Sequence, residues 1–424
     1  MITVASSVVA INPEVATVLG CGPKNPIVPT ASEKLEANIV LLGDSTGNKV
    51  LVVSVDALYI GPGLRTHLES VLSPSLKPHE IFVAATHTHN APQLDDTKPK
   101  LGLPVPQHFH QVAFRIAEAA KELLGQAPCE VRVFSRRYRV KSVVRRRWRR
   151  PVTISRAGIG FFDIQALRNP RTGKITSEVI EFVDQDKNLM ALVWIMPCHP
   201  TSFPDPRTIS PHFIGEVRQR IRAKSGSEEI PVVFLQGASG DIRPPAYRAA
   251  RFDFSEHLRR VLRGKIFDSF SESQYRQWVE KVFREFDSGR AMQNWKATSS
   301  ETALVGSSHF TMRLNEAYDF EYSNPRFFTC HVLQIAGLKI IGVSAEPTWK
   351  MRQSLLQARP QTTLVGCIDD TFGYLPTPRE FETGGYEASG FLSSFSLESV
   401  SAEGAPSLIG RFVKDAIKTS ELEI

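Results

Sequence analysis

Short apolar runs rich in β-branched residues recur along the chain, and each run stops at polar residues. Runs of this length and composition are typical of buried strands. They lie at residues 50–58, 81–89, 189–200, 231–241, 338–346 and 362–370. Between them, residues 107–125 and 211–224 have the apolar spacing of amphipathic helices. This alternation predicts an α/β fold with one or more central mixed β-sheets flanked by helices.

Several of the predicted strands end in residues that can do chemistry. The run at 81–89 ends in His87 and His89, a later run ends at His199, and another ends at Glu346. In α/β sheets, ligands gather beyond the carboxyl ends of the strands, so we expect a site there. Side chains two positions apart on an extended strand point to the same side. His87 and His89 are therefore expected to share one space.

Residues 250–300 break the pattern of strands. Two stretches in this segment, 252–267 and 273–286, have helical periodicity, and we interpret the segment as a helical insertion. No linker rich in proline, glycine and serine divides the chain, and it contains no internal repeat. Residues 1–424 are therefore predicted to form a single domain.

The composition is that of an ordinary globular protein, with 42% hydrophobic and 22% charged residues in a chain of 424. No apolar run reaches the roughly 18 residues of a transmembrane helix, and the N-terminal stretch lacks the basic region of a secretory signal. The 5 cysteines are odd in number and have no CxxC spacing, which argues against a disulfide framework. We expect a cytoplasmic protein without a transmembrane segment.

The net charge of +7 is concentrated in residues 136–150, RRYRVKSVVRRRWRR. Arginines interleaved with aromatic residues can bind phosphates and stack on bases. Val140, Val143 and Val144 instead favour a strand or hairpin within a folded domain. Nucleic acid is therefore not expected as a partner, although a non-enzymatic protein that binds nucleic acid or an anionic surface remains an alternative.

The histidines and the glutamate at the strand ends are the residue types of a catalytic zinc site, which keeps one position open. Each of them also has a structural alternative. His199 in CHP is compatible with a buried histidine bonded to backbone, and Glu346 in SAEPT with a cap on a helix that begins near Pro347. The chain contains no GxSxG motif, no P-loop and no GxGxxG after a strand.

Several motifs carry a resemblance to a known family. ATHTHNAP, CHPTSF, QGASGDIRP, SAEPT and GYLPTPREFETGGYEA occur in this order between about residue 80 and residue 390. In sequence and in order they resemble the motifs of the neutral/alkaline, non-lysosomal ceramidase family. The resemblance covers the catalytic domain of that family and not its C-terminal immunoglobulin-like domain.

The resemblance implies a metal-dependent amidohydrolase that acts on linear amides. Carried over motif by motif, it implies Zn²⁺ as the cofactor and His87, His199, Glu346 and Tyr374 as its ligands. It further implies that His89 transfers protons and that Tyr386 donates to the oxyanion. VVRRRWR at 143–149 resembles the segment that supplies an arginine to the substrate carbonyl. This implies Arg146 in that role, with Arg168 as a rival.

The sequence therefore favours a zinc-dependent hydrolase of an N-acyl amide, with a sphingolipid as one candidate substrate. A cytoplasmic amidase or deacylase of a small polar metabolite is an alternative with the same chemistry. The motifs predict neither the acyl chain length nor the oligomeric state.

Overall fold

The structure is a computed structural model that describes most of the chain. The described residues are 1–21, 33–147, 152–155, 158–161, 175–247, 267–291, 296–297, 304–314, 318–320, 326–357, 359, 361–400 and 405–422.

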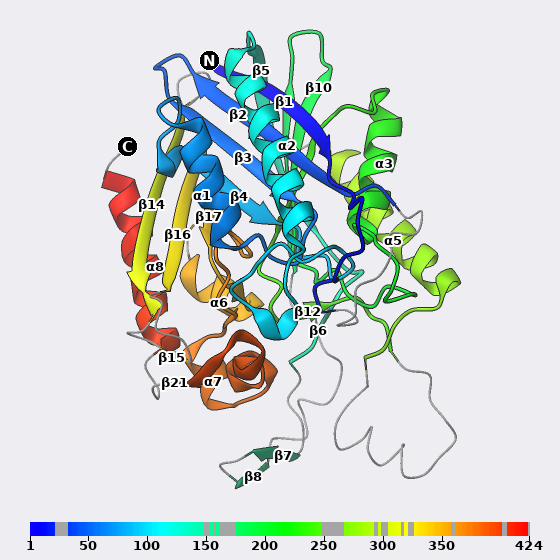
Figure 1. Ribbon diagram of the computed structural model, residues 1–424, viewed down its shortest axis with the longest axis vertical. Helices are drawn as coiled ribbons and strands as arrows, with labels where there is room; N and C mark the ends of the chain where they lie inside the picture. The colour runs from blue at the N-terminus through cyan, green and yellow to red at the C-terminus, as the bar shows by residue number, and fades with distance from the viewer. Residues whose placement is uncertain are drawn as a thin grey trace.

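A large mixed sheet forms the centre of the fold (Figure 1). Its order is β11-β10-β9-β5-β1-β2-β3-β4, and β13 pairs with β5. The strands are β1 (Ile2–Ala10), β2 (Glu36–Asp44), β3 (Lys49–Val55), β4 (Ile81–Ala85), β5 (Cys129–Arg139), β9 (Thr176–Val183), β10 (Leu189–Met196), β11 (Val232–Gln236) and β13 (Lys296–Ala297). Strands β3 and β4 pair in parallel, as do β10 and β11, and the other neighbours are antiparallel.

Alternating apolar residues give the large sheet two buried faces. On β2, Ile39 and Leu41 belong to the cluster that includes helices α1 (Gly61–Leu72) and α2 (Pro106–Gly125). Val40 and Leu42 belong instead to a cluster shared with a second sheet. The period of 2 thus places one face under helices and the other against a sheet. In Figure 1, α1 and α2 lie across the strands of the N-terminal half.

The second sheet has the order β14-β16-β17-β19. Its strands are β14 (Val305–Arg313), β16 (Phe327–Ile335), β17 (Leu338–Val343) and β19 (Thr362–Val365). Strand β14 contacts β2 and β3 of the large sheet, and helix α8 (Ala405–Leu422) contacts β14 and β16. Figure 1 shows α8 beside these strands. The two sheets therefore pack together, with α8 against the second.

Helix α3 (Phe213–Ser225) is held to the large sheet by buried ion pairs. Arg218 donates to both carboxylate oxygens of Asp56, at 2.6 and 2.8 Å, and Arg222 donates to both oxygens of Glu36, at 2.7 and 2.8 Å. Bidentate pairs of this kind fix orientation as well as position. Asp56, which ends a predicted strand, therefore has a structural partner.

Helix α5 (Glu272–Ala291) packs against α3 and β5. The shorter elements are β6 (Val144–Arg145), β7 (Val152–Ser155), β8 (Gly158–Phe161), β12 (Ile242–Arg243), β15 (Tyr318–Phe320), β18 (Glu346–Pro347), β20 (Tyr374–Leu375), β21 (Leu397–Val400), α6 (Trp349–Leu355), α7 (Pro378–Glu382), and the single turns η1 (Pro78–Glu80), η2 (Pro99–Leu101), η6 (Tyr386–Gly390) and η7 (Leu392–Phe395).

The predicted fold class is confirmed, since mixed sheets are flanked by helices and the predicted strands are present. The carboxyl-terminal boundaries are wrong, because each predicted strand runs three to five residues past the observed one. The strand predicted at 81–89 ends at Ala85, and His87 has a left-handed backbone with φ of 66°. Of the two helices expected within 250–300, α5 corresponds to the second, and 252–266 lies outside the described residues. That this segment is an insertion, and that the chain is one domain, remain predictions. Among the described helices, none combines the length and apolarity needed to cross a membrane.

Candidate metal centre

Four predicted ligands come together from separate parts of the fold. His87 follows β4, and His199 follows β10. Glu346 begins β18, which pairs in parallel with β20, so that Glu346 and Tyr374 are direct neighbours in register. All four residues are buried. His87 and His199 thus follow the carboxyl ends of strands, as the strand pattern predicts, whereas Glu346 and Tyr374 begin two short paired strands.

The imidazoles of His87 and His199 are oriented by backbone carbonyls. Nδ1 of His87 lies 3.1 Å from the carbonyl oxygen of Leu58, and Nδ1 of His199 lies 2.8 Å from that of Ser239. A carbonyl oxygen can only accept a hydrogen bond, so Nδ1 carries the hydrogen in both rings. Each Nε2 is therefore left with a lone pair in the neutral ring.

Both Nε2 atoms face the same carboxylate oxygen. Oε2 of Glu346 lies 2.9 Å from Nε2 of His199 and 3.4 Å from Nε2 of His87. Ligand atoms around tetrahedral zinc, with bonds of 2.0–2.1 Å, are about 3.3 Å apart. Both distances to Oε2 of Glu346 are therefore close to the spacing of neighbouring ligands around one ion.

A tyrosine orients the other oxygen of the same carboxylate. The hydroxyl of Tyr59 donates to Oε1 of Glu346 at 2.5 Å. Glu346 does not cap the helix that follows, because Thr348 is the N-cap of α6 and accepts from the backbone N–H of Met351. The structural alternative for Glu346 is therefore wrong.

Tyr374 and His89 complete the surroundings. The hydroxyl of Tyr374 lies 3.3 Å from Nε2 of His199, and the two rings are stacked with an interplanar angle of 7°. The ring of His89 lies 5.1 Å from that of His87 and 6.1 Å from that of His199, between centroids. His87 and His89 thus share one space, although they lie on a loop rather than on a strand.

Burial and mutual charge shift the pKa values of these groups. Burial, with the nearby charges of His87 and His199, holds the pKa of His89 well below its usual range. Burial lowers the pKa of His199 to about 4. Burial alone would raise the pKa of Glu346, but the charges of His87 and His199 hold it well below its usual value. Several buried side chains with shifted pKa values in one place are typical of functional sites.

These residues fit a metal ion. Within the described part of the chain, no hydrogen-bond partner exists for Nε2 of His87, Nε2 of His89 or Oε2 of Glu346, although all three atoms are buried. Ligand atoms of His87, His89 and His199 lie within 4.8 Å of one another. Buried polar atoms normally have partners, and a cation would satisfy all of these at once. The buried histidine cluster could thus hold a metal, and His89 lies beside the predicted histidine ligands.

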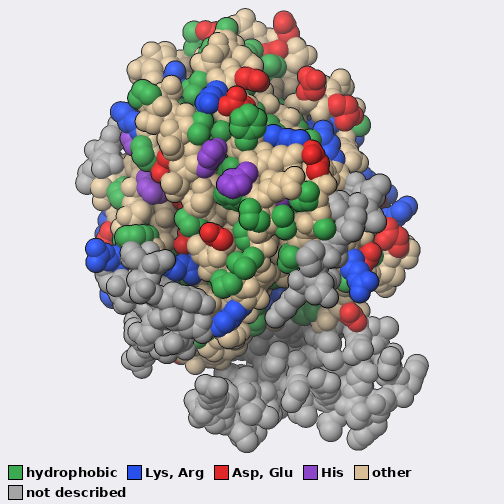
Figure 2. All heavy atoms as spheres, viewed as in Figure 1, with side chains coloured by type: hydrophobic (Ala, Val, Ile, Leu, Met, Phe, Trp, Pro, Cys, Tyr) green, Lys and Arg blue, Asp and Glu red, His purple; other side chains and the backbone are tan. Residues whose placement is uncertain are grey.

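The arginine run is anchored by carboxylates. Arg145 donates to Asp241 at 2.5 and 2.8 Å, and Arg147 pairs with Glu387 at 2.9 Å. Arg146 lies between them, with its Nε donating to Glu387 at 2.6 Å. The guanidinium of each of these three arginines therefore has a protein carboxylate as its partner, which disfavours a role for them in binding nucleic acid phosphates. On the face drawn in Figure 2, lysine and arginine side chains are interspersed with acidic ones.

Arg146 also lies beside the site tyrosines. Its guanidinium carbon is 4.6 Å from the ring centroid of Tyr386 and 6.0 Å from that of Tyr374. The ring of Tyr386 lies 5.4 Å from that of Tyr374, and 43% of Tyr386 is exposed. The structure thus brings Arg146 and Tyr386 to the open side of the ligand cluster. The rival, Arg168, lies outside the described residues.

Two side chains of the site were missed by the sequence analysis. Tyr59 comes one residue after the strand predicted at 50–58. Its place at the end of a predicted strand could have identified it as a candidate for the site. Arg243 is on β12, and the carbonyl of its neighbour Ile242 accepts from the backbone N–H of His199 at 3.0 Å. The charge of Arg243 contributes to the lowered pKa values of His89 and His199. Its buried Nε has no hydrogen-bond partner among the described residues.

Solved structures share this fold. A ceramidase described as complexed with C2 matches with a TM-score of 0.71 and 14% sequence identity, over 98% of this chain and 74% of that one. The neutral ceramidase from Pseudomonas aeruginosa matches with a TM-score of 0.69 and 14% identity, over 98% of this chain and 73% of that one. No protein-family model matches the chain. No curated protein matches it either. The chain therefore has the fold of neutral ceramidase over nearly its whole length, as its motifs predict.

Proposed function

We propose that this chain is a zinc-dependent hydrolase of an N-acyl amide bond, acting as one catalytic domain. The observation that carries this proposal is the convergence of Nε2 of His87, Nε2 of His199 and Oε2 of Glu346, with the other polar atom of each residue already held by the protein. Such outer contacts are characteristic of metal ligands. The likeness in fold to proteins described as ceramidases supports the same chemistry.

The residues beside the ligands have distinct tasks in this proposal. A zinc ion bound to His87, His199, Glu346 and Tyr374 would lower the pKa of a water molecule to near 7 and polarise the amide carbonyl. His89 takes a proton at Nε2 from the attacking water and passes it to the leaving amine. Burial and the charges of His87 and His199 hold the pKa of His89 well below its usual range, so the ring is neutral before the transfer.

Arg146 and Tyr386 stabilise the negative charge that develops on the carbonyl oxygen. Tyr386 is partly exposed beside the buried Tyr374, and Arg146 lies over the Tyr386 ring. A donor of this kind contributes about 2–4 kcal/mol to transition-state stabilisation. Glu387 fixes the guanidinium of Arg146 through its Nε, which supports a preorganised donor.

A small polar substrate is favoured over a long-chain lipid by one residue, Arg243. No described carboxylate pairs with its guanidinium, whereas Arg145, Arg146 and Arg147 all have such partners. A partly buried guanidinium beside the ligand histidines suits a carboxylate or another strongly polar oxygen of the substrate. An N-acyl amino acid would supply one next to its amide bond.

The proposal is tested by measuring acid release from a panel that includes a ceramide, an N-acyl amino acid and an N-acyl amine without a carboxylate. Hydrolysis of at least one amide is expected from zinc-loaded protein, with loss after chelation and in His199→Ala. In Arg243→Leu, hydrolysis of the N-acyl amino acid should fall because its KM rises. Hydrolysis of the other two substrates should not change. Failure of zinc-loaded protein to cleave any of the three, or cleavage that survives chelation, contradicts the proposal.

A further inference from the structure

A second cluster of ligand-type side chains lies away from the candidate metal centre. His309 on β14 and His331 on β16 are direct partners across the two strands, and their ring centroids are 5.1 Å apart. Asp369, which follows β19, completes the cluster, and ligand atoms of the three residues lie within 4.8 Å of one another. None of the three belongs to the site described above.

Each residue directs an unsatisfied atom into the cluster. Nε2 of His309, Nδ1 of His331 and Oδ2 of Asp369 are buried, and none has a hydrogen-bond partner in the described parts of the chain. The distance of 3.6 Å between Nε2 of His309 and Oδ2 of Asp369 is too long for a hydrogen bond. One unsatisfied buried atom costs about 1–3 kcal/mol, so three that face one another indicate a missing common partner.

Hydrogen bonds with surrounding residues determine which atom of His331 and which atom of Asp369 can bind a metal. Nε2 of His331 lies 2.8 Å from the carbonyl oxygen of His79, so this nitrogen carries the hydrogen and Nδ1 keeps its lone pair. Oδ1 of Asp369 accepts from Arg65 at 2.8 Å, which leaves Oδ2 for the cluster. Arg65 is itself fixed by the carbonyls of Pro78 and Ile81, in the segment that contains His79. This is the arrangement in which second contacts orient metal ligands.

An ion pair between protonated His309 and Asp369 is the simplest alternative. It would account for two of the three atoms but would leave Nδ1 of His331 without a partner. The charged side chains that act on His331 are Asp369, His309 and Arg65. Arg65 pairs with Asp369 and with Glu69, each at 2.8 Å, so its charge is balanced outside the cluster as well as by Asp369.

We propose that His309, His331 and Asp369 form a second metal site, selective for zinc or a similar divalent transition ion. Two imidazole nitrogens and one carboxylate oxygen are a donor set for such ions, and not for Ca²⁺ or Mg²⁺, which prefer oxygen ligands. Tetrahedral zinc needs ligand atoms about 3.3 Å apart. The observed limit of 4.8 Å therefore requires a closure of at most about 1.5 Å when the ion binds.

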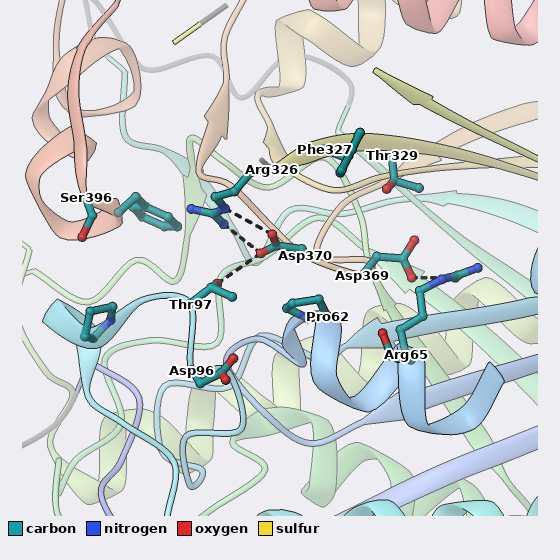
Figure 3. Close-up of a pocket in the computed structure, with 13 residues that line it drawn as sticks. Pro62, Arg65, Asp96, Thr97, Arg326, Phe327, Thr329, Asp369, Asp370 and Ser396 are labelled. Atoms are coloured by element: carbon teal, nitrogen blue, oxygen red, sulfur yellow. Dashed lines mark hydrogen bonds and ion pairs between the residues drawn. The ribbon is translucent and has the colours of Figure 1, made fainter. Parts of the chain in front are cut away.

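The ion has a route to this site and a structural consequence there. Asp369 and Arg65 line a cavity of about 600 Å³, shown in Figure 3, and the side chain of His309 is 19% exposed. The ligands come from two strands of the second sheet and from the loop after β19, which contacts β4 of the large sheet through the backbone N–H of Asp369 and the carbonyl of Val83. An ion here would therefore link β14 and β16 to the loop whose backbone contacts β4.

The test measures how many equivalents of zinc bind to metal-stripped protein. Binding is measured by calorimetry, and by elemental analysis after excess ion has been removed. The wild type should bind two equivalents, and His309→Asn, which changes a partly exposed residue, should bind one. His110→Asn is the matched control, because His110 is an exposed histidine on α2, and it should bind two. Circular dichroism establishes that each variant is folded.

A second variant separates the two sites. His87→Ala/His199→Ala, which removes the first centre, should still bind one equivalent, and added zinc should raise its Tm. The same addition should leave the Tm unchanged when His309→Asn is introduced as well. Unaltered stoichiometry in both His309→Asn and Asp369→Asn would overturn the second site. If the wild type binds only one equivalent and His87→Ala/His199→Ala still binds it, the first centre is contradicted and the second site stands.

Discussion

The hydroxyl of Tyr59 and Oε1 of Glu346 form a 2.5 Å hydrogen bond between residues 287 positions apart in the chain. The bond fixes the carboxylate so that its second oxygen faces Nε2 of both His87 and His199. Tyr59 is buried, and its ring also packs on that of His87, with centroids 5.1 Å apart. One tyrosine thus orients two of the proposed ligands.

Tyr59→Phe is expected to weaken zinc binding by about 10–100-fold, because it removes the outer contact of a ligand while leaving all ligands in place. The dissociation constant is measured by competition with a chromogenic chelator. Tyr275→Phe is the control, since Tyr275 is a buried tyrosine whose hydroxyl has no partner among the described residues. Equal zinc affinities for the two variants would show that Tyr59 does not act through Glu346.

His89→Ala should keep the zinc of the first centre and lose roughly 10²–10⁴-fold in kcat, because a proton-transfer group does not hold the ion. Metal content and turnover are measured on the same preparation, with His110→Ala as the control. A ligand atom of His89 lies within 4.8 Å of those of His87 and His199. Loss of zinc together with turnover would therefore assign His89 to the ligand set.

Arg146→Lys should lower kcat and kcat/KM together, since lysine keeps the charge but cannot reproduce the planar guanidinium held by Glu387 over Tyr386. Arg137→Lys is the control, because Arg137 is exposed on β5 and pairs with Glu178. A rise in KM with unchanged kcat would indicate that Arg146 binds the substrate without stabilising the transition state.

The low pKa of Glu36 predicts that the free energy of unfolding decreases in acid. Burial would raise its pKa, but Arg222 and Arg218 lower it from 4.5 to about 2. A carboxyl whose pKa is lower in the folded state stabilises that state above the unfolded pKa, and the stabilisation is lost as the pH falls from about 4.5 towards 2. The full effect is roughly 3 kcal/mol.

The free energy of unfolding, measured in denaturant between pH 6 and pH 3, tests the role of Glu36. Glu36→Gln should be less stable than the wild type at pH 6, because Arg222 loses its buried partner, and the difference should narrow as the pH falls. A difference that stays constant over this range would show that the pKa of Glu36 is not shifted by folding.

The strand pattern was sufficient to predict the fold class and the meeting of His87, His199 and Glu346. Each of these residues follows a β-rich run, and the carboxyl ends of such runs gather at one place. The left-handed backbone of His87 could not be predicted from local propensity. It belongs to the loop that follows β4, where Nδ1 of His87 contacts the carbonyl of Leu58, a residue 29 positions earlier in the chain.

Arg136 of the basic segment is buried and donates to the carbonyl of Arg290, a contact that the sequence could not reveal. Arg149 and Arg150 lie outside the described residues. The pairing of Arg145–Arg147 with Asp241 and Glu387 joins segments about 100 to 240 positions apart, and a charge count along the sequence cannot reveal such partners. The second cluster was missed for the same reason, since it depends on the register that places His309 opposite His331.

The most direct test of the central claim is the zinc content per chain of His199→Ala relative to the wild type, measured by elemental analysis on folded protein together with amide hydrolysis. Loss of one equivalent of zinc and of all hydrolysis is predicted, because Nε2 of His199 is held towards Oε2 of Glu346 by the Ser239 carbonyl. His110→Ala should retain both. Zinc content equal to that of the wild type in His199→Ala would contradict the proposed metal centre.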